Sequence, residues 1–376
     1  MTVSAKETPP RPGSRPCWVE VDLTAIAANI KALNEFCGVP IAAVVKADGY
    51  GHGSVEVARA AIEGGAAWLA VALLEEGRTL RDAGIGVPIL LLAEPPPESA
   101  PEIVAAGLTP AIYTETMLAA LSKAAGDAGI SVHLKVDTGM HRLGASPERA
   151  LELAEKIAAT RNVELSGVWT HLAASDEVEN PYTIDQVHGF ERVLNAINAP
   201  SALRHAANSA GAIYHADARY SLVRVGISIY GVPPSPGRRL PAGLTLQPAL
   251  AWKAKVAYAK QLPAGAPVGY GLTYRMPASG RVATIPVGYA DGYFRSLGNR
   301  AEVLIGGKRF PVAGAVSMDN ITVDLGEAHV DPGDEVVLLG RQGNEEITAT
   351  ELAERAGTIS YEVLARIGKR VPRVYM

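Results

Sequence analysis

The chain has 376 residues, of which 48% are hydrophobic and 20% are charged, and its formal net charge is -4. This composition is typical of a folded globular protein, and without a basic excess it predicts neither nucleic acid nor a membrane surface as a partner. The length exceeds one ordinary domain, but a single α/β barrel can use about 250 residues, so we expect a barrel and a smaller domain.

The N-terminal segment and the cysteines bear on the cellular compartment. Residues 1–16 contain Glu7 and four prolines, unlike the basic and apolar regions of a signal peptide, so we expect a disordered tail. No window reaches the roughly 18 apolar residues of a membrane helix. Cys17 and Cys37 match neither a disulfide framework nor a metal-ligand spacing. The sequence therefore predicts a cytoplasmic protein without a metal site.

Short apolar runs alternate with amphipathic stretches from residue 23 onward. Residues 23–33 repeat apolar side chains at helical spacing, and PIAAVVKA then has the continuous apolar pattern of a buried strand. Similar runs follow at WLAVAL, PILLLA, LTPAIY, SVHLKVD, LSGVWTHL, LRHAA and LVRVGISIYG. About eight strands joined by helical crossovers predict an eight-stranded (β/α)8 TIM-like barrel over residues 17–245, with segment 17–22 a candidate to pair with the next domain. The alternative is an open doubly wound sheet, but no GxGxxG motif follows the first strand of this sequence to support a dinucleotide site.

The pattern changes beyond residue 245. Strand-like segments are now separated by turn signals such as Gly306-Gly307, which predicts a two-residue hairpin. One helix, approximately TATELAERAG, is expected within this region. We therefore predict that residues 246–376 form a mainly β C-terminal domain, with strands near RVATIPV, AEVLI, KRFPV, NITVDL and DEVVLL.

Polar and cationic residues occur where the predicted barrel strands end. Functional groups of such barrels gather at the C-terminal ends of the strands. An amine at the end of a buried strand is costly to desolvate, so it either reaches solvent or is used chemically. So many cationic groups at one edge predict an anionic ligand. The residues are Lys46, Lys135, Arg142, His171, His205, Asn208, Ser209, Arg224 and Gly226.

Nine motifs in this order resemble the alanine racemases, which are pyridoxal phosphate enzymes with an α/β barrel followed by a β domain. The resemblance covers roughly residues 18–375, and it agrees with the two domains predicted above. The motifs are VVKADGYGHG, HLKVDTGMHRLG, THLAASDE, HAANSAG, RVGISIYG, VGYGLTYR, IPVGYADGYFR, VSMDNITVDLG and TISYEVL.

The resemblance implies a binding site for pyridoxal 5′-phosphate. Lys46 would carry the cofactor as a Schiff base, which suits a partly desolvated lysine at a cationic site because such an amine loses its proton readily. Arg224 would face the pyridine nitrogen and leave it largely unprotonated, which restrains transamination. Hydroxyls and backbone amides would hold the phosphate. The implied cofactor-binding set is Lys46, Tyr50, His171, Asn208, Ser209, Arg224, Gly226, Ile227 and Tyr361.

The resemblance also implies two catalytic bases, because racemisation needs proton transfer on both faces of the α-carbon. Lys46 would serve one face, and Tyr270 of the partner subunit would serve the other, which implies a homodimer with shared active sites. A phenol acts as a base only where neighbouring positive charge stabilises its anion. His171 and Arg224 are the candidates for that charge.

Further residues match substrate and entrance positions of the family. Arg142 and the backbone of Met318 would bind the substrate carboxylate, and Lys135 matches a lysine that can be carbamylated. Tyr289 and Tyr361 resemble gate residues of a narrow entrance. Ala315 departs from the family pattern, because an arginine is common there, and its effect on the entrance is open.

Each assignment has a structural alternative that the sequence leaves open. A lysine at a strand end can reach solvent, a serine can cap a helix, and a buried arginine can pair with a carboxylate. The tyrosines can be packing residues, and histidines such as His171 and His205 can be satisfied core residues.

The function implied is an alanine racemase that interconverts L-alanine and D-alanine and supplies D-alanine for peptidoglycan. A broad-specificity racemase of the same fold is an alternative, because entrance width sets substrate size. A non-catalytic pyridoxal phosphate barrel is another, although it would lack residues 246–376. A decarboxylase of basic amino acids would need a cysteine in the second domain, and none follows Cys37.

Overall fold

The computed structural model describes residues 15–376, so the predicted N-terminal tail lies almost wholly outside the described part. The chain divides into two compact units. One unit comprises residues 24–50 and 54–247, and the other comprises residues 15–23, 51–53 and 248–376. Each unit is described by itself.

The first unit is a barrel of eight parallel strands. Neighbouring strands follow the order β8-β7-β6-β5-β4-β3-β2-β9. The two ends of this order are joined by backbone hydrogen bonds from Ser221 N to Arg204 O and from Arg224 N to Ala207 O. The strands are β2 (Ile41–Val44), β3 (Trp68–Val71), β4 (Ile89–Leu91), β5 (Thr109–Ile112), β6 (Ile130–Lys135), β7 (Val163–Trp169), β8 (Leu203–His205) and β9 (Val223–Val225). The predicted (β/α)8 barrel is therefore confirmed.

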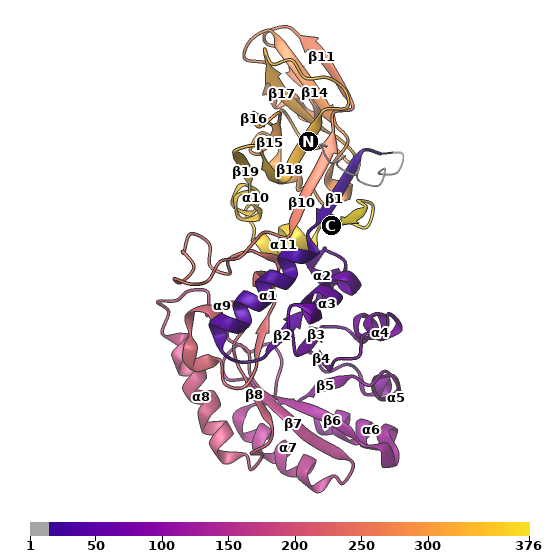
Figure 1. Ribbon diagram of the computed structural model, residues 1–376, viewed down its shortest axis with the longest axis vertical. Helices are drawn as coiled ribbons and strands as arrows, with labels where there is room; N and C mark the ends of the chain where they lie inside the picture. The colour runs from indigo at the N-terminus through magenta and orange to yellow at the C-terminus, as the bar shows by residue number, and fades with distance from the viewer. Residues whose placement is uncertain (1–14) are drawn as a thin grey trace, which may run out of the picture. The chain divides into compact units, whose positions relative to one another are not determined.

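Helices follow the strands and lie outside them (Figure 1). Their buried faces repeat at helical spacing, as in α1, where Ile26, Ile30 and Leu33 are fully buried. Strands β2, β3 and β4 are apolar without alternation, because both faces of a parallel sheet are covered. The helices are α1 (Leu23–Cys37), α2 (Lys46–Tyr50), α3 (Ser54–Glu63), α4 (Leu74–Asp82), α5 (Ala100–Ala105), α6 (Glu115–Ala125), α7 (Pro147–Ala159), α8 (Tyr182–Ala196) and α9 (Ser209–Tyr214).

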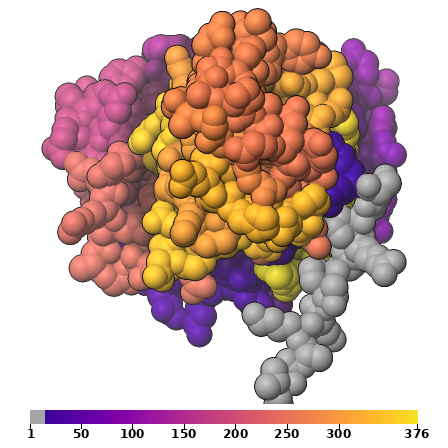
Figure 2. Space-filling model, turned by 90° about the horizontal axis from the view of Figure 1, so that it is seen from above, coloured from indigo at the N-terminus to yellow at the C-terminus, as the bar shows by residue number. Residues whose placement is uncertain are grey.

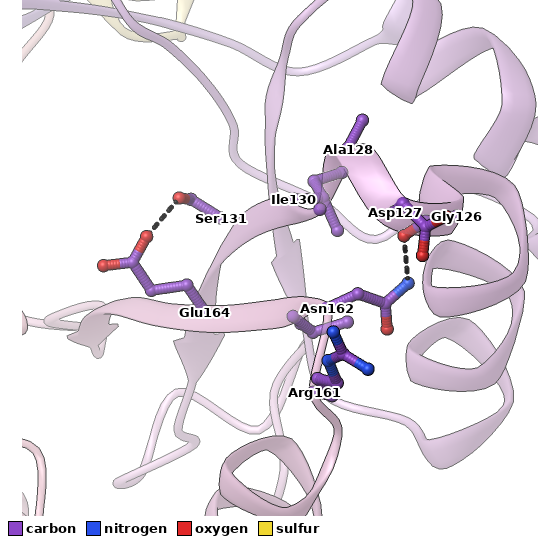
Figure 3. Close-up of a pocket in the computed structure, with 10 residues that line it drawn as sticks. Gly126, Asp127, Ala128, Ile130, Ser131, Arg161, Asn162 and Glu164 are labelled. Atoms are coloured by element: carbon purple, nitrogen blue, oxygen red, sulfur yellow. Dashed lines mark hydrogen bonds between the residues drawn. The ribbon is translucent and has the colours of Figure 1, made fainter.

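An open groove lies at the N-terminal ends of β6 and β7 (Figure 3). Its polar side chains bond within the groove: Ser131 Oγ donates to Glu164 at 2.9 Å, and Asn162 Nδ2 donates to the Gly126 carbonyl at 2.8 Å. This end of a barrel usually serves stability, and reactive groups gather at the other end. We therefore assign no site to this groove.

The second unit is mainly β. Its largest sheet has the order β16-β15-β18-β10-β1-β20, with β19 paired to β18, and a smaller sheet has the order β11-β14-β17. Figure 2 shows one face of this unit in orange and yellow. The strands are β1 (Cys17–Val21), β10 (Leu250–Lys255), β11 (Tyr258–Leu262), β12 (Pro267–Val268), β13 (Tyr274–Arg275), β14 (Gly280–Ile285), β15 (Glu302–Ile305), β16 (Lys308–Pro311), β17 (Ile321–Gly326), β18 (Glu335–Gln342), β19 (Glu345–Ile347) and β20 (Arg373–Tyr375).

Strand β1 pairs antiparallel with β10 and parallel with β20. The hairpin predicted at Gly306-Gly307 joins β15 and β16, and both glycines have positive φ, 58° and 73°, as a type I′ turn requires. Cys17 and Cys37 are both buried free thiols.

The expectation of one helix in this domain is wrong. Helix α10 (Ala349–Ala356) is present, and its Thr348 hydroxyl accepts from the Glu351 amide as a cap. A second helix, α11 (Ser360–Ala365), follows after Gly357 and carries Tyr361. Its six residues are too few to show helical periodicity in sequence. No helix among residues 15–376 combines the length and the apolar character needed to cross a bilayer.

Candidate active site

The lysine predicted at the end of the first barrel strand lies beyond it. Strand β2 ends at Val44, and Lys46 opens a turn in which Ala47, Asp48, Gly49 and Tyr50 all have φ between 51° and 60°. This is a left-handed helical turn, which costs roughly 1–2 kcal/mol for each residue that carries a Cβ. Such strain is retained where the surroundings enforce it, and it often marks a functional segment.

Hydrogen bonds from several elements hold this turn. The Tyr230 hydroxyl donates to the Val44 carbonyl at 3.0 Å, and the Gly49 amide donates to the Val45 carbonyl at 2.9 Å. At the far end, Asp48 Oδ1 accepts from the Ser54 amide at 2.9 Å. The direction in which the Lys46 side chain leaves the backbone is therefore determined by the fold.

The Lys46 amine is half-buried, and its pKa is below the ordinary lysine value. Burial is the main cause, and the positive charge of Arg142 adds to it, whereas the negative charge of Glu76 acts in the opposite direction. A lysine with a lowered pKa is neutral in a larger fraction of molecules, so it can act as a nucleophile or as a base.

Hydroxyl and amide groups come together beside this turn. The Gly226 amide donates to the Ser209 hydroxyl at 3.0 Å, and a Cβ placed on Gly226 would lie 2.6 Å from the Tyr50 hydroxyl. Any larger residue at position 226 would displace the phenol, which explains the glycine. Burial raises the pKa of Tyr50 to about 12, so the phenol keeps its proton and can donate it to an anion.

The amide of Asn208 has a structural task. Its Oδ1 accepts from the Gly211 amide at 2.9 Å and from the Ser175 hydroxyl at 2.8 Å, which caps α9. Ser209 is therefore not the cap of this helix, because Asn208 is the capping residue.

Ile227 follows Gly226 directly and is fully buried.

Arg224 is buried and donates to neutral acceptors. Its guanidinium donates to the carbonyls of Thr170, His205 and Ala206 at 2.7, 3.1 and 2.8 Å. It also donates to His205 Nδ1 at 2.9 Å, and a longer contact of 3.3 Å joins it to His171 Nδ1. None of these partners is a carboxylate, and burial lowers the pKa of Arg224 to about 9.

The bonds of Arg224 determine where the protons of two histidines lie. Because the guanidinium only donates, His205 Nδ1 must accept, so the neutral ring carries its proton on Nε2. That proton is then donated to His133 Nδ1, which lies 2.9 Å away. Burial and the charge of Arg224 hold the pKa of His205 well below its usual value and lower that of His133 to about 3. Both histidines are therefore neutral.

Lys135 lies in the same cationic environment. Its Nζ donates to the Leu92 carbonyl at 3.2 Å and lies 4.4 Å from the centre of the Trp169 ring, which also contacts Arg224 at 4.4 Å. Burial, followed by the charges of Arg224 and Arg142, lowers the pKa of Lys135 to about 7. A much larger fraction of these amines is therefore neutral near pH 7 than for an ordinary lysine.

The barrel thus brings together most of the side chains that the sequence singled out at its strand ends. His171 shares this environment, since burial and the charge of Arg224 hold its pKa well below the usual value. His133, Trp169 and Glu76 were not predicted as members of the site. His133 could have been found, because it lies two residues before Lys135 on one strand and therefore on the same face.

The β domain holds Tyr270, Tyr289 and Met318 in three adjoining loops, and Arg142 is an exposed residue of the barrel unit. Tyr270 lies in a loop with positive φ at Gly269, Gly271 and Leu272, and its side chain is 74% exposed. A Cβ on Gly269 would contact the backbone of Ala315 at 3.4 Å. The loop of Tyr270 therefore lies against the segment that carries Ala315.

The loops of Tyr289 and Met318 are joined by backbone bonds. The Tyr289 amide donates to the Ser317 carbonyl, and the Ala290 amide donates to the Met318 carbonyl, both at 3.0 Å. The side chains of Tyr289 and Met318 are exposed, and Tyr361 is half-buried in α11. Tyr270, Tyr289 and Met318 are therefore not packing residues of this domain's core.

These features define an enzyme of the α/β-barrel class, in which an activated lysine, an anion-binding group of hydroxyls and amides, and a buried arginine meet at the C-terminal edge of the strands. The N-terminal domain of alanine racemases matches residues 21–234, and their C-terminal domain matches residues 249–375. The chain belongs to the alanine racemase family, whose members are amino-acid isomerases. The family resemblance seen in the motifs is confirmed.

Relatives and solved structures agree with this membership. The alanine racemase of Symbiobacterium thermophilum is 50% identical over 370 residues, which cover 96% of this chain and 98% of that relative. The crystal structure of alanine racemase from E. faecalis has a TM-score of 0.92 at 37% identity, covering 97% of this chain and 99% of that chain. A histidine racemase from Leuconostoc mesenteroides has a TM-score of 0.90 at 30% identity, covering 97% and 99%.

Proposed function

We propose that the protein interconverts L-alanine and D-alanine, using pyridoxal 5′-phosphate held at Lys46 and a second base from a partner subunit. The observation that carries this proposal is the arrangement of Lys46, Tyr50, Ser209 and Arg224 at one edge of the barrel, in a chain that matches both domains of the alanine racemase family. The D-alanine would serve peptidoglycan synthesis in the cytoplasm.

The residues of the barrel fit this cofactor. Its aldehyde needs a neutral amine, which the lowered pKa of Lys46 favours. Its phosphate needs donors, and Tyr50, Ser209 and the backbone at Gly226 and Ile227 offer hydroxyls and amides close together. Its ring nitrogen needs a partner, and Arg224 is a cation without a carboxylate partner. When bound, the cofactor withdraws electrons from the amino acid and makes its α-hydrogen acidic.

Lys46 and Tyr270 would divide the proton transfers. The neutral Lys46 amine takes the α-hydrogen from one face, and Tyr270 of the partner subunit supplies a proton to the other face, so the configuration is inverted. The exposed position of Tyr270 supports this role, because a base for another subunit must project from its own domain. A homodimer with two shared sites follows.

The other residues would orient the substrate and limit side reactions. Arg142 and the backbone of Met318 would bind the carboxylate, and Tyr289 and Tyr361 would line the entrance. Arg224 donates hydrogen bonds and does not deliver a proton readily, so it keeps the ring nitrogen from gaining full positive charge and disfavours transamination.

Lys135 would become a carbamate. Its neutral amine attacks carbon dioxide, a bond forms between Nζ and the carbon, and one proton is released to solvent. The product is an anion, which attracts Arg142, whereas the protonated amine repels it. The pKa of about 7 supports this step, because only the neutral amine reacts.

A broader amino-acid racemase is the second candidate. The histidine racemase with the same fold favours it, because its substrate is much larger than alanine. Ala315, where an arginine is common in the family, removes a bulky charged side chain and also favours it.

The decisive experiment is an assay of the purified protein with both enantiomers of alanine, serine, lysine, arginine and histidine. Racemisation of alanine at a kcat/KM at least tenfold above every other substrate supports the proposal. Equal rates with several amino acids support the broader racemase, and no racemisation with cofactor bound contradicts both.

A further inference from the structure

The strained turn after Lys46 is tied to the next barrel strand by one carboxylate. Glu76 lies in the first turn of α4, which follows β3. Its Oε1 accepts from the Ala47 amide at 2.6 Å, and its Oε2 accepts from the amides of Ala72 and Leu73 at 2.9 and 3.1 Å. One side chain thus joins the segments that leave two neighbouring strands, β2 and β3.

The contacts of Glu76 suit a side chain that only accepts hydrogen bonds. Three backbone amides converge on it, and all three donate. A carboxylate accepts through both oxygens, whereas the amide of a glutamine would direct an NH2 group at one of these donors. Bonds to an ionised acceptor are also about twice as strong as neutral ones.

The bond to Ala47 acts where the backbone first becomes left-handed. Ala47 has φ 51° and ψ 49°, and it directly follows Lys46. Asp48 and Tyr50 have the same unfavourable handedness without being glycines. A segment of this kind relaxes toward ordinary backbone angles unless it is held, and relaxation would turn the Lys46 side chain away from its present direction.

Glu76 also carries a charge that reaches the Lys46 amine. Burial and Arg142 lower the pKa of Lys46, and Glu76 raises it. Glu76 therefore has two separable effects, one on the geometry of the turn and one on the proton affinity of the lysine.

We propose that Glu76 is a positioning residue for Lys46, which clamps the left-handed turn to the segment after β3 and moderates the charge of the amine. The inference rests on the proposed function, because it assumes that Lys46 binds pyridoxal phosphate. Glu76 itself contacts neither cofactor nor substrate in this proposal.

The test measures how fast the cofactor-free protein captures added pyridoxal phosphate, with borohydride fixation, peptide mapping to Lys46 and a series of pH values. Glu76→Gln should slow capture roughly 10- to 100-fold, since small misplacements of a reacting group have effects of that size. It should also move the midpoint of the pH profile down by about 0.5 unit or more, because a negative charge is lost near the amine.

Two further variants separate the clamp from the charge. Glu76→Asp keeps the charge but shortens the reach, so capture should be slow with the midpoint of the wild type. Glu75→Gln is the matched control, because Glu75 is exposed in the same helical turn and has no bond to the Lys46 turn. Glu75→Gln should change neither the rate of cofactor capture nor the midpoint of its pH profile. If Glu76→Gln does not fold, the capture rate of Glu76→Asp alone decides whether Glu76 holds the turn.

Hydrogen exchange gives a readout that does not depend on the cofactor. Peptides spanning residues 46–54 should exchange at least tenfold faster in Glu76→Gln than in the wild type and in Glu75→Gln. Wild-type exchange and wild-type capture in Glu76→Gln would overturn the proposal, as would an equal midpoint shift in Glu75→Gln. If the wild type itself captures no cofactor at Lys46, the proposed function fails, and exchange still decides whether Glu76 holds the turn.

Discussion

Arg224 in the barrel is 2% exposed and Tyr270 in the β domain is 74% exposed, although both carry proposed functional groups. Arg224 has its orientation set by five hydrogen bonds within its own unit. Among residues 15–376, no hydrogen bond of this kind is formed by the Tyr270 side chain, whereas the backbone of its loop is held by a bond from the Leu272 amide to the Gly269 carbonyl and by bonds from Asn299 Nδ2 to Thr273. The barrel therefore contains a site that is organised in advance, whereas the β domain presents exposed side chains that its own described residues do not orient.

This difference has a chemical consequence. Burial, followed by the positive charges of neighbouring groups, lowers the pKa values of Lys46, Lys135, His171 and His205. If Tyr270 is a base, nearby positive charge must stabilise its anion, and the proposal takes that charge from the barrel of a second subunit.

The largest expected effect is on the barrel side. Lys46→Ala removes both the attachment point and one base, so racemisation should fall by more than about 10⁴-fold, beyond the usual value of a single acid or base. Borohydride reduction and peptide mapping should find the cofactor on Lys46 in the wild type and nowhere in the variant. Lys31→Ala, an exposed lysine on α1, is the control and should behave as wild type. An adduct on any other lysine rejects the assignment.

Tyr270→Phe tests the role of the exposed tyrosine of the β domain. Racemisation should fall about 10²- to 10⁴-fold in both directions, because one positioned acid or base is lost and the equilibrium between enantiomers is unchanged. Exchange of the α-hydrogen with deuterium should be retained better for D-alanine, which we assign to Lys46, than for L-alanine. Tyr258→Phe, another exposed tyrosine of the β domain, should leave all rates unchanged.

Mixing subunits sharpens this prediction. If the protein is the proposed homodimer, Lys46→Ala and Tyr270→Phe each lack one base in both sites, and a mixed dimer has one site with both bases when Tyr270 acts across subunits. Activity should therefore return after subunit exchange. Equal deuterium exchange for both enantiomers would contradict the base assignment, and asymmetric exchange without restored activity would contradict the shared site.

Arg224→Glu replaces the organising cation of the barrel with an anion. Racemisation should fall about 10²- to 10³-fold, as for other preorganised electrostatic groups. The share of transamination should rise, and absorption should appear at longer wavelength, because a carboxylate favours a protonated ring nitrogen. The control is Arg204→Glu, an exposed arginine on the neighbouring strand. If the ratio of transamination to racemisation is unchanged in Arg224→Glu, Arg224 does not face the cofactor ring.

The smallest effect concerns Lys135. Its folded-state pKa of about 7 lies below the ordinary value, so the reactive neutral amine is lost as pH falls through 7 and gained as pH rises. Native mass spectrometry with added bicarbonate should show one extra carbon dioxide, increasing with pH and absent in Lys135→Gln. Because Arg142 is exposed, the KM for alanine should rise less than about fivefold in the variant. An added mass of carbon dioxide that does not change with pH would contradict reaction through the neutral Lys135 amine.

Sequence patterns predicted much of the barrel because its strands are continuous apolar runs separated by helices of regular spacing. They located Lys46, Lys135, His205 and Arg224 near strand ends for the same reason. They did not predict the left-handed turn from Ala47 to Tyr50, since alanine, aspartate and tyrosine all disfavour those angles. Short elements such as α11 were missed because six residues show no period.

By itself, the sequence determined the order of the barrel strands, the family and the identity of most candidate groups, since these depend on local pattern and on motifs. Tertiary structure alone decided that Arg224 has no carboxylate partner, that His205 and His133 are neutral, and that Glu76 reaches the Lys46 turn. The physical reason is that proton affinity and backbone strain depend on desolvation and on atoms within a few ångströms. Those atoms belong to residues far apart along the chain, whose proximity only the closed barrel creates.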